Sequence, residues 1–373
     1  MLPVLVTISQ IITAGIVITA LALLMYALTF NLKDRVARSF ALVLIYVCVT
    51  FTGEALGGSS TAPYWISLWL KFQWVGILLL PAGFLGFSDA LLATTGDLSR
   101  SRRMWLGVVY LFSFALAIAL ALNIFLGPVV LNVPPAPYLA ATLQADLFTV
   151  FYVVAMLIAW WQIFQALRRT ATPTSRRRMY YLLVGSVALG AGSFPFLLFG
   201  SGFASQFEMV FWLVAIFTNL LVGAMLTVMA YAVAFFGVPW PDRVVKSRLF
   251  KWLMRGPATA SLTLGLVTLV RRLGEAFGAS YTALVPLVMV GTILLCQYLI
   301  TLLAPFGEKV LFWGKDSPDL EMLRLLEERF ITRDDLDQFQ ETILAAICDR
   351  LQAGGAYLLA RDSGHYELIG RTG

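Results

Sequence analysis

Long apolar runs separated by short polar loops make up most of the chain. A helix needs about 20 apolar residues to cross a hydrocarbon core of about 30 Å. Nine runs approach or exceed this length, and we expect each to be a transmembrane helix: Val4–Phe30, Ser39–Leu56, Trp65–Ala93, Met104–Leu126, Leu143–Leu167, Tyr180–Phe199, Met209–Phe236, Pro257–Leu273 and Tyr281–Leu303. The pattern predicts an all-α polytopic membrane protein, a bundle of about nine helices.

The pattern changes at Pro305, where amphipathic stretches replace the apolar runs. One helix is predicted to begin at Ser317-Pro318-Asp319, and its apolar residues recur three or four positions apart. A second is predicted to begin at Thr332. We expect residues 305–353 to form cytoplasmic signalling helices, with the alternative of a solvated connector packed on its own domain. The expected relay residues lie around the break between the helices: Phe330, Ile331, Thr332 and Leu336.

Lysine and arginine are distributed asymmetrically between the expected loops. Loops one, three, five and seven carry several basic residues each, whereas loops two, four and six carry none. Loop eight is an exception because Arg271 and Arg272 end the eighth run. Cytoplasmic loops are rich in Lys and Arg. We therefore expect a multi-pass protein of the cell (plasma) membrane, with its N-terminus outside and its C-terminus in the cytoplasm.

Composition supports a membrane protein and excludes several other classes. The chain is 60% hydrophobic and 13% charged, whereas a soluble domain is about 25% charged. The net charge of +6 comes from basic residues in short loops, so we expect no nucleic-acid partner. The three cysteines are far apart in sequence, and one histidine, His365, is present. We expect no metal and no cofactor, and no catalytic motif is visible.

The seventh loop, residues 237–256, differs from the others. Pro241 is suited to a helix start, after which Val245, Leu249 and Trp252 share a side and the basic residues lie off it. This pattern predicts an interfacial helix that lies on anionic lipid. The segment separates a seven-helix region, residues 1–236, from an additional pair of transmembrane helices, residues 257–304.

Residues 354–373 read as the first hairpin of a water-soluble domain. Ala356–Ala360 and Tyr366–Ile369 are strand-like, and Asp362-Ser363-Gly364 is typical of a turn between them. Two strands alone are only marginally stable in water. We therefore expect this hairpin to start an α/β domain that continues in a longer protein.

Ionisable residues inside apolar runs are the candidates for a functional site, because burying charge in a membrane is costly. Glu54 ends the second expected span and Lys71 lies two turns into the third, at comparable depth in the outer leaflet. We expect them to form an ion pair or to line a ligand cavity. The alternative is a structural pair or two side chains that reach the interface separately. The other ionisable residues lie near span ends: Asp89, Asp146 and Glu208.

The layout resembles the seven-transmembrane N-terminal region of bacterial sensor histidine kinases. The resemblance is carried by seven helices with the N-terminus outside, by the end of the seventh span at Met229–Ala234, and by the basic exit Arg243–Lys246. The stretch from Leu326 to Leu336, with Ile343–Leu359 after it, is similar to the helical lead into a GAF domain in such kinases. The extra helix pair departs from the simplest members, and no phosphoacceptor or ATP-binding module is visible in the sequence.

The resemblance implies a sensory input module that detects an external or membrane-borne stimulus and relays it to a cytoplasmic GAF and kinase-type output. Whether the whole protein is an enzyme is left open, because an output kinase would lie beyond Gly373. The implied partners are the lipid bilayer and a small ligand or membrane protein, and a homodimer is compatible with the pattern. Two alternatives are a small-molecule transporter and an accessory subunit of a larger membrane complex.

Overall fold

The computed structural model divides the chain into two compact units, Met1–Ala304 and Pro305–Gly373. Each unit is considered by itself. The structure describes the following residues: 2–30, 34–58, 60, 62–96, 99–131, 135–170, 173–191, 204, 206–234, 249–276, 284–311, 340–342, 344–346, 348, 353, 355–362 and 365–372.

The first unit is a helical bundle. Its helices are α1 (Leu2–Phe30), α2 (Arg35–Gly57), α3 (Pro63–Thr94), α4 (Arg100–Ala121), α5 (Leu143–Arg169), α6 (Pro173–Ala191), α9 (Glu208–Val233), the π-helix η1 (Met254–Ala258), α11 (Thr259–Ala276) and α12 (Leu284–Leu311). In the described part of the chain, eight helical segments are long and apolar enough to cross a membrane, as expected for a multi-pass membrane protein. The sixth expected span, Tyr180–Phe199, coincides with α6 as far as Ala191 and then leaves the described residues.

Side chains next to the helices set where several of them begin. The Asp34 carboxylate accepts hydrogen bonds from the backbone of Val36 and Ala37 at the start of α2. The Thr142 hydroxyl accepts from the Ala145 N–H at 3.3 Å and donates to the Phe125 carbonyl at 2.6 Å. These oxygens satisfy N–H groups that a helix start leaves without partners. Thr142 therefore both caps α5 and holds the preceding turn.

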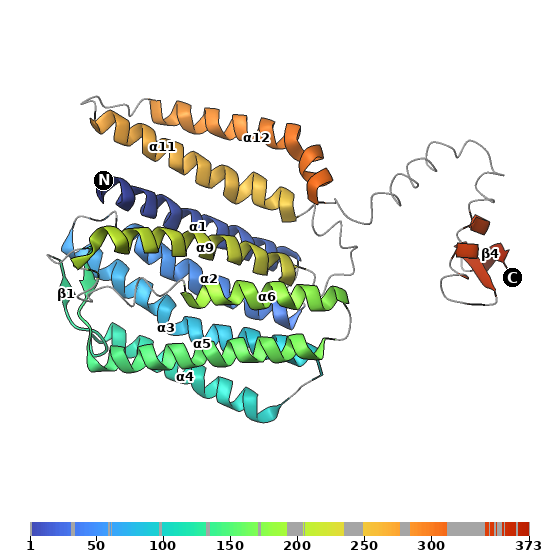
Figure 1. Ribbon diagram of the computed structural model, residues 1–373, viewed down its shortest axis with the longest axis horizontal. Helices are drawn as coiled ribbons and strands as arrows, with labels where there is room; N and C mark the ends of the chain where they lie inside the picture. Colours follow the sequence, from blue (N-terminus) through green and yellow to red (C-terminus); the bar gives the residue numbers. More distant parts are fainter. Residues whose placement is uncertain are drawn as a thin grey trace. The chain divides into compact units, whose positions relative to one another are not determined.

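Six of the helices form a closed ring. In order around the ring, the neighbours in contact are α1, α2, α3, α5, α6 and α9, and α9 returns to α1 (Figure 1). Outside the ring, α4 packs on α3 and α11 packs on α1. The most extensive contact joins α2 and α3. There Gly76 leaves no room for a side chain, because an added Cβ would lie 2.7 Å from the Thr50 nitrogen and from the Tyr46 carbonyl oxygen.

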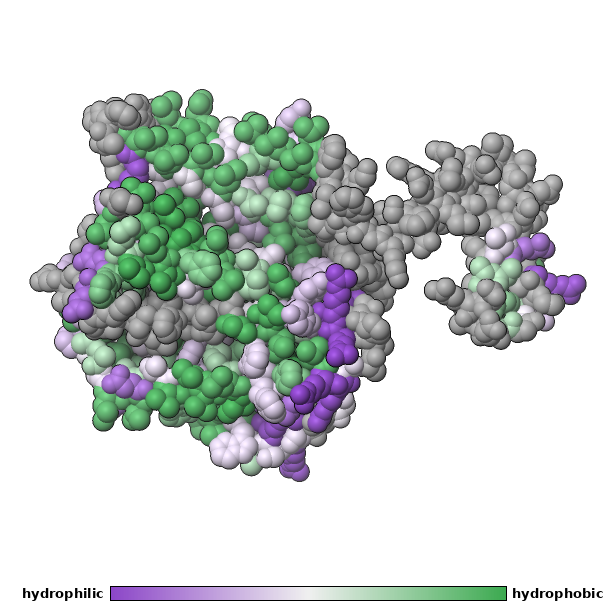
Figure 2. All heavy atoms as spheres, in the orientation of Figure 1, coloured by the Kyte–Doolittle hydropathy of each residue, from purple (hydrophilic) through white to green (hydrophobic). Residues whose placement is uncertain are grey.

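Apolar side chains fill the inside of the bundle and also cover much of its outside. Phe40, Phe84 and Phe87 are at most 1% exposed and belong to one continuous core. On the outside, Leu111 and Leu143 are 70% and 77% exposed. Figure 2 shows hydrophilic side chains gathered towards the ends of the bundle, with apolar ones between them. Such an outer surface suits a hydrocarbon environment.

The fourth helix is shorter than the sequence predicts. It ends at Ala121, not Leu126, because Asn123 takes a left-handed conformation with φ of 60° and turns the chain back. Phe125 and Leu126 then pack into the core from this turn, which explains why they extend the apolar run. A two-stranded hairpin that the sequence analysis did not predict follows: β1 (Val129–Val130) pairs with β2 (Tyr138–Leu139) in antiparallel register.

The expected interfacial helix, residues 237–256, lies largely outside the described residues, and its contact with lipid stays a prediction. Residues 235–248 lie outside the described residues, but Leu249–Leu253 is helical and continues through η1 towards α11. Leu249 is 2% exposed, and the Trp252 indole N–H donates to the Ala22 carbonyl of α1 at 2.9 Å. Trp252 therefore packs on α1, where its ring meets that of Tyr26 edge to face.

The second unit contains the C-terminal hairpin that the sequence predicts. The strands β3 (Ala356–Asp362) and β4 (His365–Thr372) pair in antiparallel register, with an irregularity between Leu358 and Leu359. Residues 340–342, 344–346 and 348 are helical, in agreement with the second amphipathic stretch. The expected relay residues Phe330, Ile331, Thr332 and Leu336 lie outside the described residues, so their role stays a prediction.

Candidate functional site

A cavity lies at one end of the bundle, beside Glu54. The end of α2, the starts of α1, α3 and α9, and the segment before β2 all contribute to it. The empty space, including the mouth, is about 580 Å³. We call it the Glu54 cavity and call this part of the bundle the Glu54 end. Its apolar wall includes Ile66, Leu70 and Trp212, and its polar wall includes Ser9, Gln10, Thr13 and Glu54.

Two polar side chains of the cavity wall, Thr13 and Glu54, belong to a chain of three side chains from three helices, and the third, Asn219, bonds to Thr13 without lining the cavity. The Asn219 Nδ2 atom of α9 donates to the Thr13 Oγ1 atom of α1 at 3.4 Å, and Thr13 donates to the Glu54 Oε1 atom of α2 at 3.5 Å. Both distances are long for hydrogen bonds. The second oxygen of Glu54 and the carbonyl oxygen of Asn219 are buried without a hydrogen-bond partner among the described residues.

The expected ion pair between Glu54 and Lys71 is not formed among the described residues. The Lys71 ammonium instead donates to the Asn123 side-chain oxygen at 2.5 Å. The turn after α4 brings Asn123 to α3, and this local partner ties the turn to the helix. Of the two residues that the sequence analysis paired, only Glu54 lines the cavity.

A second cavity lies next to the first and shares Leu70, Gln73 and Pro137 with it. Asp146, in the first turn of α5, lines this second cavity. Gln73 is 4% exposed and lies on α3 against Gly53, where an added Cβ on the glycine would be 2.6 Å from the Gln73 Cβ. The close approach of α2 and α3 at Gly53 thus holds Gln73 between the two cavities.

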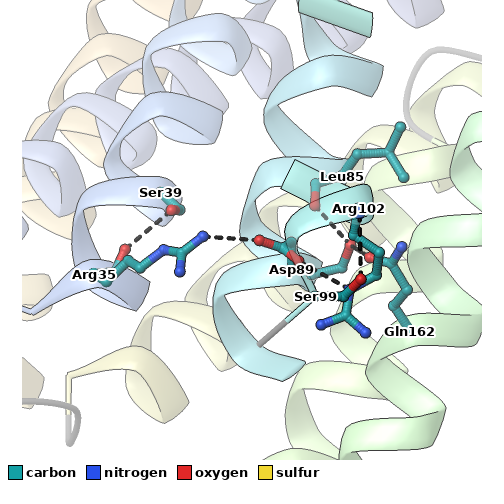
Figure 3. A network of polar contacts seen from close by, with 8 residues as sticks. Arg35, Ser39, Leu85, Asp89, Ser99, Arg102 and Gln162 are labelled. Carbon is teal, nitrogen blue, oxygen red and sulfur yellow. Dashed lines mark hydrogen bonds and ion pairs between the residues drawn. The ribbon is translucent and has the colours of Figure 1, made fainter. Parts of the chain in front are cut away.

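At the opposite end of the bundle, Asp89 joins three helices. Its side chain is 8% exposed and lies between two arginines, as Figure 3 shows. The Arg35 Nη2 atom of α2 is 2.8 Å from one carboxylate oxygen, and the Arg102 Nε atom of α4 is 3.2 Å from the other. The adjacent Ser88 hydroxyl is 2.7 Å from the Gln162 Oε1 atom of α5. We call this part of the bundle the Asp89 end, and its contacts hold the helices together.

The sequence analysis found some of these residues and missed others. Glu54 and Asp89 stand out as ionisable residues in apolar runs. The partners of Asp89 were missed, because Arg35 and Arg102 were interpreted as loop charges. Asn219 was missed although an amide in the middle of the apolar run Met209–Phe236 is a visible signal. Thr13 gives no such signal, since threonine is common in apolar helices. Glu208 lies in the first turn of α9 and does not line the cavity.

No protein-family model matches this chain, and no match is found among curated proteins.

Proposed function

We propose that the chain is a sensory input module of a cell membrane, which detects a stimulus at the Glu54 end and relays it to the unit that begins at Pro305. The Glu54 cavity carries this proposal. Its wall includes Glu54 of α2, and one carboxylate oxygen of Glu54 is buried without a hydrogen-bond partner among the described residues. Thr13 links Glu54 to a second such oxygen, on Asn219 of α9. Unsatisfied buried polar atoms destabilise a fold, so natural proteins keep few of them. Binding is one role that explains their presence.

The core beyond the Glu54 cavity favours a receptor over a transporter. Between Glu54 and Asp89 the α2–α3 core is packed with apolar side chains, and Leu44, Ile77 and Phe87 are each 0% exposed. Transporters typically carry their substrate site near the membrane midplane, at broken helices. A cavity that stops above a filled core is better suited to binding that changes helix packing.

The orientation of the bundle is part of the proposal. Arg35, Arg102, Arg168 and Arg169 all lie on helices at the loops that the positive-inside rule places in the cytoplasm. The Glu54 end then faces outwards, where an external stimulus arrives. The GAF-like domain and the kinase-type output belong to the same proposal, which draws on the resemblance to sensor histidine kinases and on the β3–β4 hairpin.

Thiol labelling tests the orientation. In a chain with its three cysteines replaced, we expect Tyr64→Cys to react with a membrane-impermeant maleimide in intact cells, because Tyr64 is 72% exposed at the start of α3. Ser101→Cys, exposed at the start of α4, should react only after the cells are permeabilised. The reverse pattern would show that the Glu54 end faces the cytoplasm.

Filling the Glu54 cavity tests the relay. Ser9 lines the cavity and is 2% exposed, so Ser9→Phe should displace the helices around it. We expect amide hydrogen exchange in residues 340–372 to change by about fivefold, which corresponds to a coupling free energy of about 1 kcal/mol. The measurement is hydrogen exchange by mass spectrometry on the chain in nanodiscs. The matched control is Leu147→Phe on the outside of α5, where Leu147 is 63% exposed.

A second variant locates the path of the relay. Inserting four glycines after Ile331 should abolish the effect of Ser9→Phe on the β3–β4 hairpin, because a flexible break does not transmit helix movement. If hydrogen exchange in residues 340–372 is the same in Ser9→Phe as in the parent, the relay is contradicted and the accessory-subunit alternative is favoured. If the parent chain carries solute flux into liposomes and the Ser9→Phe variant does not, the transporter alternative is correct.

A further inference from the structure

Two unpartnered acceptors are connected through Thr13, and one of them belongs to Glu54 in the wall of the Glu54 cavity. Four buried side-chain polar atoms lack a hydrogen-bond partner within the part of the chain that the structure describes, and two of these are Glu54 Oε2 and Asn219 Oδ1. Thr13 connects the two residues, since it accepts from Asn219 and donates to Glu54. The single hydroxyl hydrogen of Thr13 is used in this chain. What the site lacks is therefore a hydrogen-bond donor.

The charge of the site points to a cation. Among the described residues that line the Glu54 cavity, Glu54 is the one with an ionisable side chain. Lys71, the nearest expected counter-ion, is bonded to Asn123 and does not line the cavity. A buried carboxylate without a cationic partner is costly, and an entering cation recovers that free energy.

The walls distinguish an organic cation from a metal ion. A hard metal cation takes about six or more oxygen ligands. Among the described residues, no group of three or more His, Cys, Asp or Glu side chains is placed to hold a metal ion, and much of the cavity lining is apolar: Ile66, Leu70, Ala136, Pro137 and Trp212. Trp212 packs with Phe211 in a small cluster that Ala136 also contacts. This lining fits a hydrocarbon group better than a shell of water.

We infer that the Glu54 cavity binds a small organic ammonium ion. Its N–H groups donate to Glu54 on the polar side, and its hydrocarbon part lies against Leu70 and Trp212. Asn219 supports the site by holding Thr13 in place from α9. The inference names the ligand class for the sensory site and so rests on the proposed function for its biological meaning, although the binding itself is measured without any output.

The test compares ammonium ions with neutral molecules of the same shape. Phenethylammonium and butylammonium are titrated into the full chain in nanodiscs by calorimetry, with 2-phenylethanol and 1-butanol as the neutral probes. We expect each ammonium ion to bind about tenfold more tightly than its alcohol, because it makes charge-assisted hydrogen bonds. Equal affinity of the two probe classes, or no heat from either ammonium ion, would overturn the inference.

Two variants assign the binding to Glu54. Glu54→Gln keeps the shape and removes the charge, and should weaken phenethylammonium binding by about tenfold. Asp146→Asn is the matched control, since Asp146 lines the neighbouring cavity and not this one. The affinity of the Asp146→Asn variant for phenethylammonium should equal that of the parent chain. Loss of binding in Asp146→Asn with full binding in Glu54→Gln would move the site to the second cavity and overturn the assignment.

A protection experiment leaves Glu54 intact, so it does not depend on how the Glu54→Gln variant folds. In a chain with its three cysteines replaced, Gln10→Cys places a thiol on the wall of the Glu54 cavity at a partly exposed position that maleimide can reach. Phenethylammonium should slow its reaction with maleimide, whereas 2-phenylethanol should not at the same concentration. Equal rates with both probes would contradict the inference.

The two proposals fail separately. If phenethylammonium binds through Glu54 but Ser9→Phe leaves exchange in residues 340–372 unchanged, the ligand class is correct and the sensory function is wrong. If Ser9→Phe changes that exchange and no ammonium ion binds, the sensory function holds and the ligand class is wrong.

Discussion

Replacing Gly76 with alanine is expected to lower the free energy of unfolding by about 3 kcal/mol, at the upper end of typical costs of overpacking. The added Cβ would lie 2.7 Å from the Thr50 nitrogen and the Tyr46 carbonyl oxygen of α2. These are backbone atoms of the most extensive helix contact in the bundle, so they cannot move aside as a flexible side chain can. Helices α2 and α3 must separate instead. Unfolding in mixed detergent micelles, followed by circular dichroism, measures the loss.

Gly107→Ala is the matched control for this prediction. Gly107 lies on α4 and has no heavy atom within 4 Å of an added Cβ. The variant should be as stable as the parent or slightly more stable, because alanine loses less conformational entropy than glycine in a helix. Equal stability of the Gly76→Ala and Gly107→Ala variants would show that the close approach of α2 and α3 is unimportant for stability.

Replacing Asp89 with alanine is expected to cost about 2 kcal/mol, between the values for exposed and fully buried ion pairs. The Asp89 side chain is 8% exposed, but Arg35 and Arg102 are 39% and 24% exposed, so solvent screens part of the attraction. Losing Asp89 removes the contact that joins α2, α3 and α4. Asp89→Asn should be less damaging, because the amide still accepts one of the two hydrogen bonds.

The control for Asp89 is Asp146→Ala. Asp146 is exposed in the first turn of α5, where it interacts with the helix dipole and should contribute at most about 1 kcal/mol. A double-mutant cycle of Asp89→Ala with Arg35→Ala isolates the pair, and the two losses should not add. Additive losses would contradict a direct contribution of the Arg35–Asp89 contact.

Ionisable residues in apolar runs predicted one residue of the candidate site but not its partners. Glu54 stood out in the sequence because a carboxyl group in an apolar run is costly, and it does line a cavity. Pairing it with Lys71 was wrong because depth along two helices does not determine which side chains face each other. The turn at Asn123 supplied a closer partner for Lys71. The residue that does bond to Glu54 is Thr13 of α1, 41 residues away in sequence, and Asn219 of α9 is connected to Glu54 only through Thr13.

Hydrophobic length and charge patterning were enough to find most of the helices. Six of the nine expected spans coincide with described helices to within a few residues at each end, because in a membrane every backbone group must be bonded within its own segment. The ninth lies in α12, which continues past Leu303 to Leu311. The fourth is shorter, and the sixth leaves the described residues after Ala191. The β3–β4 hairpin was equally predictable, since its alternation and turn residues are local signals.

What tertiary structure alone decided is which faces of those helices meet. Most helices here are apolar on all sides, so their sequences do not distinguish the core from the outer surface. Phe84 and Leu111 both lie in apolar runs, although Phe84 is 1% exposed and Leu111 is 70% exposed. The contact of Trp252 with α1 is likewise not visible in the sequence, although its indole N–H donates to the Ala22 carbonyl. The ring order, the Glu54 cavity and the Asp89 contacts all depend on helix rotation. Close packing at glycines such as Gly76 sets that rotation, and a one-dimensional pattern of apolar residues does not contain it.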